Sequence, residues 1–515
     1  MKAYFRKNLA LSLTLLVLAG FFIVAIRGME TKDWVITLLR GLSVGAVTFL
    51  VASGFSLIFG LLDVLNLAHG TLFMIGAYIA WTVYVRPDTF VDLLAPILLT
   101  VSGFTLSGLW RNLSKRIQVK PRAMRFAPWA GLLLSAVILS YVLSRYPISI
   151  WDVANYGQSP VTYSFMADQG ILLSPPSVAF DEISLGVAAF GLLLAGMLGA
   201  FSLSLFEKSG LSGTRLRWQN FIGFAVVLSL GLVTLFANDA ITTFLTDLDT
   251  TWLFFISLIT AALSGALLGG LMESTLIRPL YSRPIYQLML TLGLSAVGIE
   301  IVRSIWGRPE FIMPKPSIFN GTGDGCPATS LAGLAQNHCS TIFLFDGRVR
   351  VYNEIFIPLV GIVVLIAVWT LLKRSRLGMI IRAGVQDREM VEALGINVRR
   401  VFTLVFALGV GLAALGGALA APSMGLSNVM GESLLLNALI ALAIGGLTSY
   451  PGAALGSLLV GMMQQFIIKY GAIGIPIPFT DIIFKPTPPL VPASTVLLMV
   501  IILLILPNGL LGKKE

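Results

Sequence analysis

The sequence has 515 residues, of which 56% are hydrophobic and only 12% are charged, and its mean hydropathy is +0.89. This composition excludes an ordinary soluble protein, which needs far more charge to cover its surface. The net charge is +10, but no basic stripe with interleaved aromatic residues is present. We therefore expect no nucleic-acid partner, and we attribute the excess charge to short cytoplasmic loops.

Apolar runs of about 20 residues recur along the sequence and predict an all-α polytopic membrane protein, because lipid forces backbone polar groups to pair within each helix. The runs do not alternate as the strands of a transmembrane barrel do. The first run is too long for a signal peptide and lacks a cleavage site, so we expect an uncleaved helix. We predict about fourteen candidate spans, some of them possible half-helices, near residues 8–27, 35–59, 70–85, 91–110, 126–145, 183–205, 219–236, 251–272, 285–306, 356–372, 401–421, 434–449, 452–470 and 491–507.

The charge of the loops tests this order of spans. With the N-terminus inside and strict alternation, five inside segments carry Lys or Arg near helix ends, whereas the outside loops 147–182 and 237–250 carry Asp and Glu but no Lys or Arg. This agrees with the positive-inside rule and predicts that both termini are cytoplasmic, with Arg27 and Lys32 as mild exceptions. The inside segments are 111–125, 207–218, 273–284, 373–400 and the tail Lys513-Lys514, and the third outside loop is 307–355.

Some of the predicted segments are short or interrupted. Residues 434–449 and 452–470 are joined by a Ser-Tyr-Pro-Gly turn, and residues 60–70 interrupt another apolar stretch. Short segments broken by Gly or Pro in both halves of a chain indicate a transport path in proteins built from repeats. Two ordinary helices joined by a tight turn explain the pattern equally well.

The two cysteines, Cys326 and Cys339, fall in the same predicted outer loop. A loop that faces the cell envelope meets an oxidising compartment, which favours a disulfide over two free thiols. Such a bond would stabilise the protein by roughly 3 kcal/mol in the chain-entropy model. We expect it to staple an outer lid or docking surface rather than to perform chemistry.

Polar residues interrupt the apolar sequence at Asp63–Gly70 (DVLNLAHG), where Asn66 can both donate and accept hydrogen bonds and His69 is one of two histidines in the chain. Polar groups within apolar sequence are costly and suggest function by default. The segment is either a break that lines the transport path or a hydrogen-bonded cluster between helices.

A second candidate is the amphipathic segment 382–397 (RAGVQDREMVEALGIN) in a predicted cytoplasmic loop. Asp387 opens the helix, where its charge opposes the helix dipole favourably. Met390, Ala393 and Leu394 form a small apolar face, and Gly395 is placed to end the helix. This face needs a partner, which is either a soluble subunit or the ends of the membrane helices.

Several motifs are absent from the sequence. It contains no G-x-x-x-x-G-K-[ST] P-loop, no HExxH, no paired CxxC and no G-x-S-x-G, so we expect no catalytic residues, no metal site and no cofactor in this chain. Charged residues within the spans are sparse, with Glu300 and Arg303 near one predicted end, whereas a proton-relay pump would show more intramembrane carboxylates.

Several stretches of the sequence resemble the branched-chain amino-acid ABC transporter permeases of the Liv type, most closely the H-type subunit. The resemblance rests on an N-x-A-H-G signature at Asn66–Gly70 within 41–79, an R-P-L block within 277–308, the R-A-x-x-x-D loop within 376–421, and a G-G-x-x-S-x-P-G-A block within 440–464. The terminal 506–512 (LPNGLLG) resembles the closing motif of the family. Together the blocks cover roughly 60% of the chain in the family's order.

The resemblance implies a role for each candidate segment. It implies that Asn66, His69, Gly70, Gly445 and Gly446 belong to the translocation path. It also implies that one segment couples the permease to its ATPase, through Arg382, Asp387, Met390, Leu394 and Gly395. The implied partners are two ATP-binding-cassette ATPases that bind the ATP, a second permease subunit, an extracytoplasmic binding protein and membrane lipid. The implied location is the bacterial cytoplasmic membrane.

One long segment departs from the family pattern. Residues 86–240 look like a membrane-embedded insertion with an outer loop, between an N-terminal part, 1–85, and a permease core, 241–515, that holds the coupling segment. A lateral cover, a partner interface and a substitute for another subunit are all open as its role.

The resemblance leaves competing functions. The leading expectation is import of Leu, Ile or Val by alternating access, along a path lined with apolar groups and a few polar ones. The same architecture could import urea or short amides. An ion-coupled secondary transporter is a less favoured alternative because intramembrane carboxylates are sparse. A membrane enzyme or scaffold has no catalytic constellation to support it.

Overall fold

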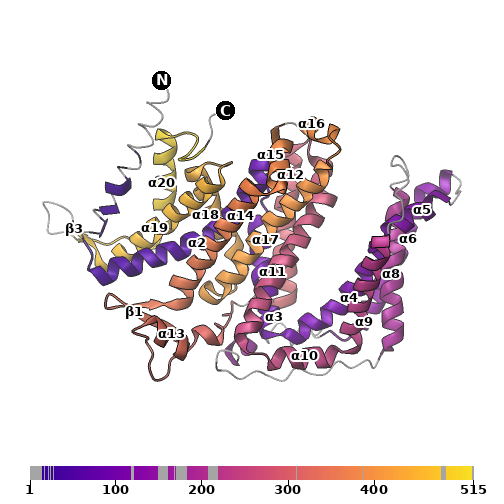
Figure 1. The fold of residues 1–515 in the computed structure, drawn as a ribbon, viewed down its shortest axis with the longest axis horizontal. Coiled ribbons are helices and arrows are strands. Elements are labelled where there is room, and N and C mark those ends of the chain that lie inside the picture. Colours follow the sequence, from indigo (N-terminus) through magenta and orange to yellow (C-terminus); the bar gives the residue numbers. More distant parts are fainter. Residues whose placement is uncertain are drawn as a thin grey trace. The chain divides into compact units, whose positions relative to one another are not determined.

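In the part of the chain that the computed structural model describes, helices predominate and two short antiparallel hairpins are the only paired strands, which confirms the all-α membrane class (Figure 1). The chain divides into two compact units, one made of residues 1–81 and 249–515 and the other of residues 82–248. The structure describes residues 28–116, 121–148, 160–166, 169, 182–206, 218–308, 310–386, 388–476 and 483–512, and scattered positions between 14 and 26.

Within these described ranges, nine helices are long and apolar enough to cross a membrane, and a tenth span is formed if the pair Asn220–Phe236 and Asn238–Asp247, bent by 79°, is counted as one. The protein is therefore a multi-pass membrane protein. Three further apolar helices are shorter. The predicted span 8–27 lies mostly outside the described residues, so the number fourteen and the placing of both termini in the cytoplasm stay predictions.

The first unit contains the permease blocks. Its helices are α2 (Thr31–Leu62), α3 (His69–Val85, whose last turn belongs to the other unit), α11 (Thr250–Met272), η2 (Glu273–Ile277), η3 (Arg278–Leu280), α12 (Pro284–Trp306), η4 (Ser317–Phe319), α13 (Leu331–Asn337), η5 (Val351–Phe356), α14 (Ile357–Arg374), α15 (Arg376–Gln386), α16 (Arg388–Ala393), α17 (Val398–Met424), α18 (Met430–Gly445), α19 (Tyr450–Ile473) and α20 (Leu490–Ile505). Its strands are β1 (Thr341–Leu344) paired with β2 (Gly347–Arg350), and β3 (Ile475–Pro476) paired with β4 (Ile483–Phe484).

Helix α2 is the centre of this unit and packs against α19 and α17, while α17 packs against α11. Small residues allow these close contacts. Gly54 of α2 faces the backbone of Gly409 in α17, and Gly265 and Gly269 of α11 face Val410 and its neighbours in α17. These glycines therefore lie at helix crossings.

The turn between α18 and α19 corrects one expectation from the sequence, because only one of the two joined segments is short. Helix α18 has 16 residues, whereas α19 has 24 and is long enough to span. Ser449 caps α19 by accepting a hydrogen bond from Gly452 N, and Pro451 occupies the first turn, so the helix begins earlier than its apolar run.

The second unit contains α4 (Pro87–Thr105), α5 (Ser107–Arg116), α6 (Pro121–Leu143), α8 (Leu185–Phe206), α9 (Trp218–Phe236) and α10 (Asn238–Asp247). Helix α4 packs against α8 and α9, and α8 also packs against α6. A buried ion pair joins Arg86 to Asp88 at 2.8 Å, and Asn238 donates to Asp92 at 3.1 Å. The predicted insertion, 86–240, falls within this unit, but its role stays open.

The loop after α12 forms a compact cap on α2. A disulfide joins Cys326 and Cys339, the pair that the sequence offers, with their Cα atoms 5.5 Å apart. Cys339 and the β1–β2 hairpin form a hydrophobic cluster with Ile36 and Leu39 of α2. In Figure 1, this hairpin and α13 lie at one end of the long helices of the unit, and α16 lies at the other end.

Candidate functional site

The first candidate segment is a break between two helices. Helix α2 ends at Leu62, and Asp63 adopts a left-handed conformation with φ of 53°. The following residues are not helical until α3 begins at His69. Asn66 Oδ1 accepts a hydrogen bond from Ala68 N at 3.1 Å, which stabilises the turn into α3.

His69 is fixed by a contact back to α2. Its Nε2 lies 3.1 Å from the carbonyl oxygen of Val51, and because a carbonyl only accepts, Nε2 carries the proton. The ring meets Phe55 edge-on. Asn66 and His69 are fully buried, and their atoms Nδ2 and Nδ1, respectively, have no hydrogen-bond partner in the described part of the chain. The structure therefore places both side chains in the protein core.

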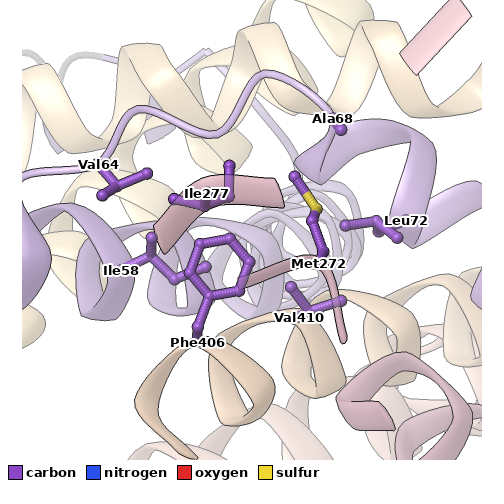
Figure 2. Packing of buried hydrophobic residues seen from close by; sticks show 8 residues of the cluster. All are labelled: Ile58, Val64, Ala68, Leu72, Met272, Ile277, Phe406 and Val410. Atoms are coloured by element: carbon purple, nitrogen blue, oxygen red, sulfur yellow. The ribbon is translucent and has the colours of Figure 1, made fainter. Parts of the chain in front are cut away.

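An apolar cluster seals this break from one side (Figure 2). Val64 and Ala68 of the break pack among side chains from four helical segments. The other members of the cluster are Ile58 of α2, Leu72 of α3, Met272 and Ile277 of the α11–η2 segment, and Phe406 and Val410 of α17. Close packing of this kind supports the break against the surrounding helices.

The three predicted glycines lie at close helix contacts. A Cβ atom on Gly70 would overlap the carbonyl oxygen of Gly431 in α18, and a Cβ atom on Gly431 would overlap that of Gly70. Gly445 and Gly446 end α18, where Gly445 O accepts from Leu511 N at 3.0 Å and Gly446 has φ of 108°. They bring the C-terminal turn against α18.

The predicted coupling segment folds as two short helices, α15 and α16, before α17. Arg382 Nη1 donates to the carbonyl oxygen of Leu372, and Gly395 has φ of 80°, which suits a residue that ends a helix. Asp387 lies outside the described residues. Met390 and Leu394 are 63% and 74% exposed, whereas Val391 between them is buried against Val398 and Phe402. The segment is thus anchored on one side and presents an apolar face on the other.

A buried polar network lies beside this segment and was missed from the sequence. Glu273, fully buried in the π-helical turn η2, accepts hydrogen bonds from Arg278, Tyr281 and Thr403, each at 2.7 Å. Tyr281 also packs edge-on against Phe402, within the cluster that supports the coupling segment. The R-P-L block marked the position of Arg278, but no local pattern linked it to Thr403, 125 residues away.

We expect Thr403→Val to lower the free energy of unfolding by about 1–3 kcal/mol, because it leaves a buried carboxylate with one partner fewer. Unfolding of the purified protein in detergent measures this. Thr275→Val is the matched control, since Thr275 is exposed and its hydroxyl donates to the carbonyl oxygen of Leu271, one turn earlier in the chain. Equal stability of the two variants would mean that the network contributes little.

A cavity of about 390 Å³ lies within the first unit, near the end of α2 that carries the disulfide cap. Helices α2, α14, α17, α18 and α19 line it together with η5 and the end of β2. Its charged and amide side chains are Arg40, Arg350, Asn353, Glu354, Asn437, Gln464 and Gln465. Its apolar side chains are Val44, Val47, Ile357, Ala420, Met424 and Leu434.

None of the five residues predicted for the translocation path lines this cavity. A sequence signal did exist for some of its residues, because Arg40 and Gln464 lie inside predicted apolar spans, where polar side chains suggest function. No signal paired Arg40 with Glu354, which lies 314 residues away just before a span. The pair noted from the sequence, Glu300 and Arg303, is a partly exposed surface pair at 2.6 Å.

Among the described residues, no three His, Cys, Asp or Glu side chains gather as they would around a metal ion.

Comparison with known proteins gives a consistent result. The family model described as the permease component of the branched-chain amino acid transport system matches residues 37–195 and 177–506. The high-affinity branched-chain amino acid transport system permease protein LivH of Salmonella typhimurium is 26% identical over 275 residues, which are 52% of this chain and 78% of the relative. No solved structure matches the chain.

Two other relatives cover less of the chain. The branched-chain amino acid permease protein BraD of Pseudomonas aeruginosa is 32% identical over 171 residues, which are 33% of this chain and 51% of the relative. The fructose import permease protein FruF of Bifidobacterium longum is 29% identical over 120 residues, which are 22% of this chain and 34% of the relative.

Proposed function

Because the chain belongs to the family of branched-chain amino acid transport permeases, we propose that it is the membrane-spanning subunit of an ATP-binding-cassette importer for amino acids with aliphatic side chains. The observation that carries this proposal is the exposed apolar face of Met390 and Leu394 on a helix whose other side is anchored to the membrane domain. Such a face suits docking of a soluble subunit.

The proposed assembly divides the work between chains. Two ATPase subunits bind and hydrolyse ATP at the end where α16 lies, and a binding protein delivers substrate at the end with the disulfide cap. A second permease subunit completes the path in the cytoplasmic membrane, in contact with lipid. This chain then holds no cofactor, and its task is to pass substrate by alternating access.

Helix α17 is the element that could transmit the effect of ATP. It starts next to the coupling segment and ends at the cavity, and its 27 residues span about 40 Å. ATP binding drives alternating access only if it favours one conformation over the other. Because α17 is one continuous helix, a displacement of the coupling segment at its start would move its other end at the cavity.

Substrate uptake tests the proposal. Vesicles that contain the permease subunits and ATPases, with binding protein outside, should accumulate labelled leucine when ATP is enclosed. Labelled urea and fructose should not accumulate. Uptake of urea in place of leucine would instead support the short-amide importer, and uptake of fructose would support a sugar importer like the relative FruF.

A further inference from the structure

We propose that the cavity beside Arg40 and Glu354 is a binding site for the charged head of an α-amino acid, with Arg40 receiving the carboxylate and Glu354 attracting the ammonium group. This rests on the proposed function, because it assumes that the chain imports amino acids. It assigns the recognition of the charged head to Arg40 and Glu354, which lie outside the blocks that carry the family resemblance.

Arg40 has donors available to a ligand. Its Nε donates to Glu354 Oε1 at 2.8 Å, and its side chain is 48% exposed. Its two Nη nitrogens have no hydrogen-bond partner in the described part of the chain, and the residue lines the cavity. A guanidinium group bound on one edge presents a planar pair of donors that matches a carboxylate.

Glu354 supplies a fixed negative charge beside this guanidinium. Its side chain is only 2% exposed, and its Oε2 accepts a hydrogen bond from Arg350 N at 2.6 Å. The carboxylate is therefore held in position by two protein donors. Each carboxylate oxygen accepts more than one hydrogen bond, so it can still attract an ammonium group that enters the cavity.

The charges favour a zwitterion over an uncharged ligand. Charged side chains inside a membrane protein are costly, and they are kept mainly where they line a pathway or a site. Urea and sugars could be bound by the amides of Asn353, Asn437 and Gln465 alone. Arg40 and Glu354, a cation and an anion side by side, match a ligand that carries both charges about one carbon apart, and Arg350 adds a second positive charge to the lining that also favours a carboxylate.

The remaining walls suit an aliphatic side chain. Val44, Val47 and Leu434 also line the cavity, so the site offers apolar side chains as well as charged ones. The volume of about 390 Å³ falls within the usual range for small-molecule sites. The hydrogen bond from Gln464 Nε2 to Asn437 Oδ1, at 3.1 Å, holds two of the lining helices together.

The test measures binding of labelled leucine to the detergent-purified assembly of permease and ATPases without the binding protein, because the binding protein would otherwise set the apparent affinity. We expect Arg40→Gln and Glu354→Gln each to weaken binding by about tenfold or more, the effect of losing one charge-assisted hydrogen bond. Arg40→Lys keeps the charge but loses the paired donors, so its affinity should lie between those of the wild type and Arg40→Gln.

Analogues then separate the two roles. Leucinamide has no carboxylate, so its competition should be insensitive to Arg40→Gln, and 4-methylpentanoate has no ammonium group, so its competition should be insensitive to Glu354→Gln. Glu300→Gln, at the surface ion pair with Arg303, is the matched control and should bind leucine as the wild type does.

Unchanged leucine affinity in correctly assembled Arg40→Gln and Glu354→Gln variants would overturn the assignment of the cavity, and so would wild-type assemblies that transport leucine in vesicles but bind none without the binding protein. Wild-type vesicles that take up no leucine would instead overturn the proposed function, before any variant is compared.

Discussion

Leu394→Asp is expected to abolish ATP-driven uptake while the protein remains folded in the membrane. The Leu394 side chain is 74% exposed on the coupling segment, so a carboxylate there costs the isolated subunit little. In a docked complex the same carboxylate would be buried without a partner, which costs several kcal/mol. The ATPase subunits should therefore no longer co-purify with the permease, and uptake into vesicles should fall to background.

Leu331→Asp is the matched control for this experiment. Leu331 is 75% exposed on α13, at the opposite end of the long helices from α16 (Figure 1). The variant introduces the same charge at a residue of the same exposure and should retain its ATPases. Co-purification of the ATPases with the Leu394→Asp permease would show that they dock elsewhere.

Gly70→Val is expected to prevent accumulation of folded permease. The first side-chain atom would overlap the backbone carbonyl of Gly431, which no change of rotamer can relieve. Helices α3 and α18 would have to separate, and His69, next in the chain, would lose its place against Val51. Overpacking in a core costs about 1–3 kcal/mol even when side chains can adjust, and a backbone clash costs more.

Gly293→Val separates this clash from the effect of valine itself. Gly293 lies within α12, and nothing lies within 4 Å of a Cβ atom added there. Both variants place a β-branched residue in a membrane helix, but only one closes a helix contact. Size-exclusion profiles and membrane yields should show loss of the first variant and retention of the second. Equal yields would mean that the contact between α3 and α18 adjusts freely.

Local sequence patterns predicted the class of the fold and the position of its helices well. Apolar runs are a local property, because each membrane helix satisfies its own backbone, and α12 and α17 begin within three residues of the predicted spans. The break at Asp63–Ala68 was also visible, because polar residues interrupt an apolar run there. Helix α19 begins two residues before its predicted span, because Ser449 caps the helix and Pro451 lies in its first turn.

The polar sites were harder to predict because they depend on tertiary contacts. Arg40 gains its partner from the helical turn η5, more than half the chain away, and Glu273 is completed by Thr403 from another helix. The periodicity of apolar residues along a helix does not predict which distant polar side chains will pair. It also could not decide between a path-lining and a packing role for Asn66 and His69, which the structure places in the core.

The family resemblance and the geometry point to different parts of the chain for substrate contact. The resemblance favours the Asn66–Gly70 signature, whereas the charged cavity involves Arg40 and Glu354. The two regions share one helix, because His69 Nε2 lies 3.1 Å from the carbonyl oxygen of Val51 in α2, the helix that also carries Arg40.

The initial rate of labelled leucine uptake into reconstituted vesicles, with ion gradients collapsed by ionophores, is the most direct test of an ATP-driven importer. Uptake should continue while ATP is present inside the vesicles, and it should stop when ATP is replaced by ADP. Uptake that proceeds without ATP and disappears with the ion gradients would contradict ATP-driven import and identify an ion-coupled transporter instead.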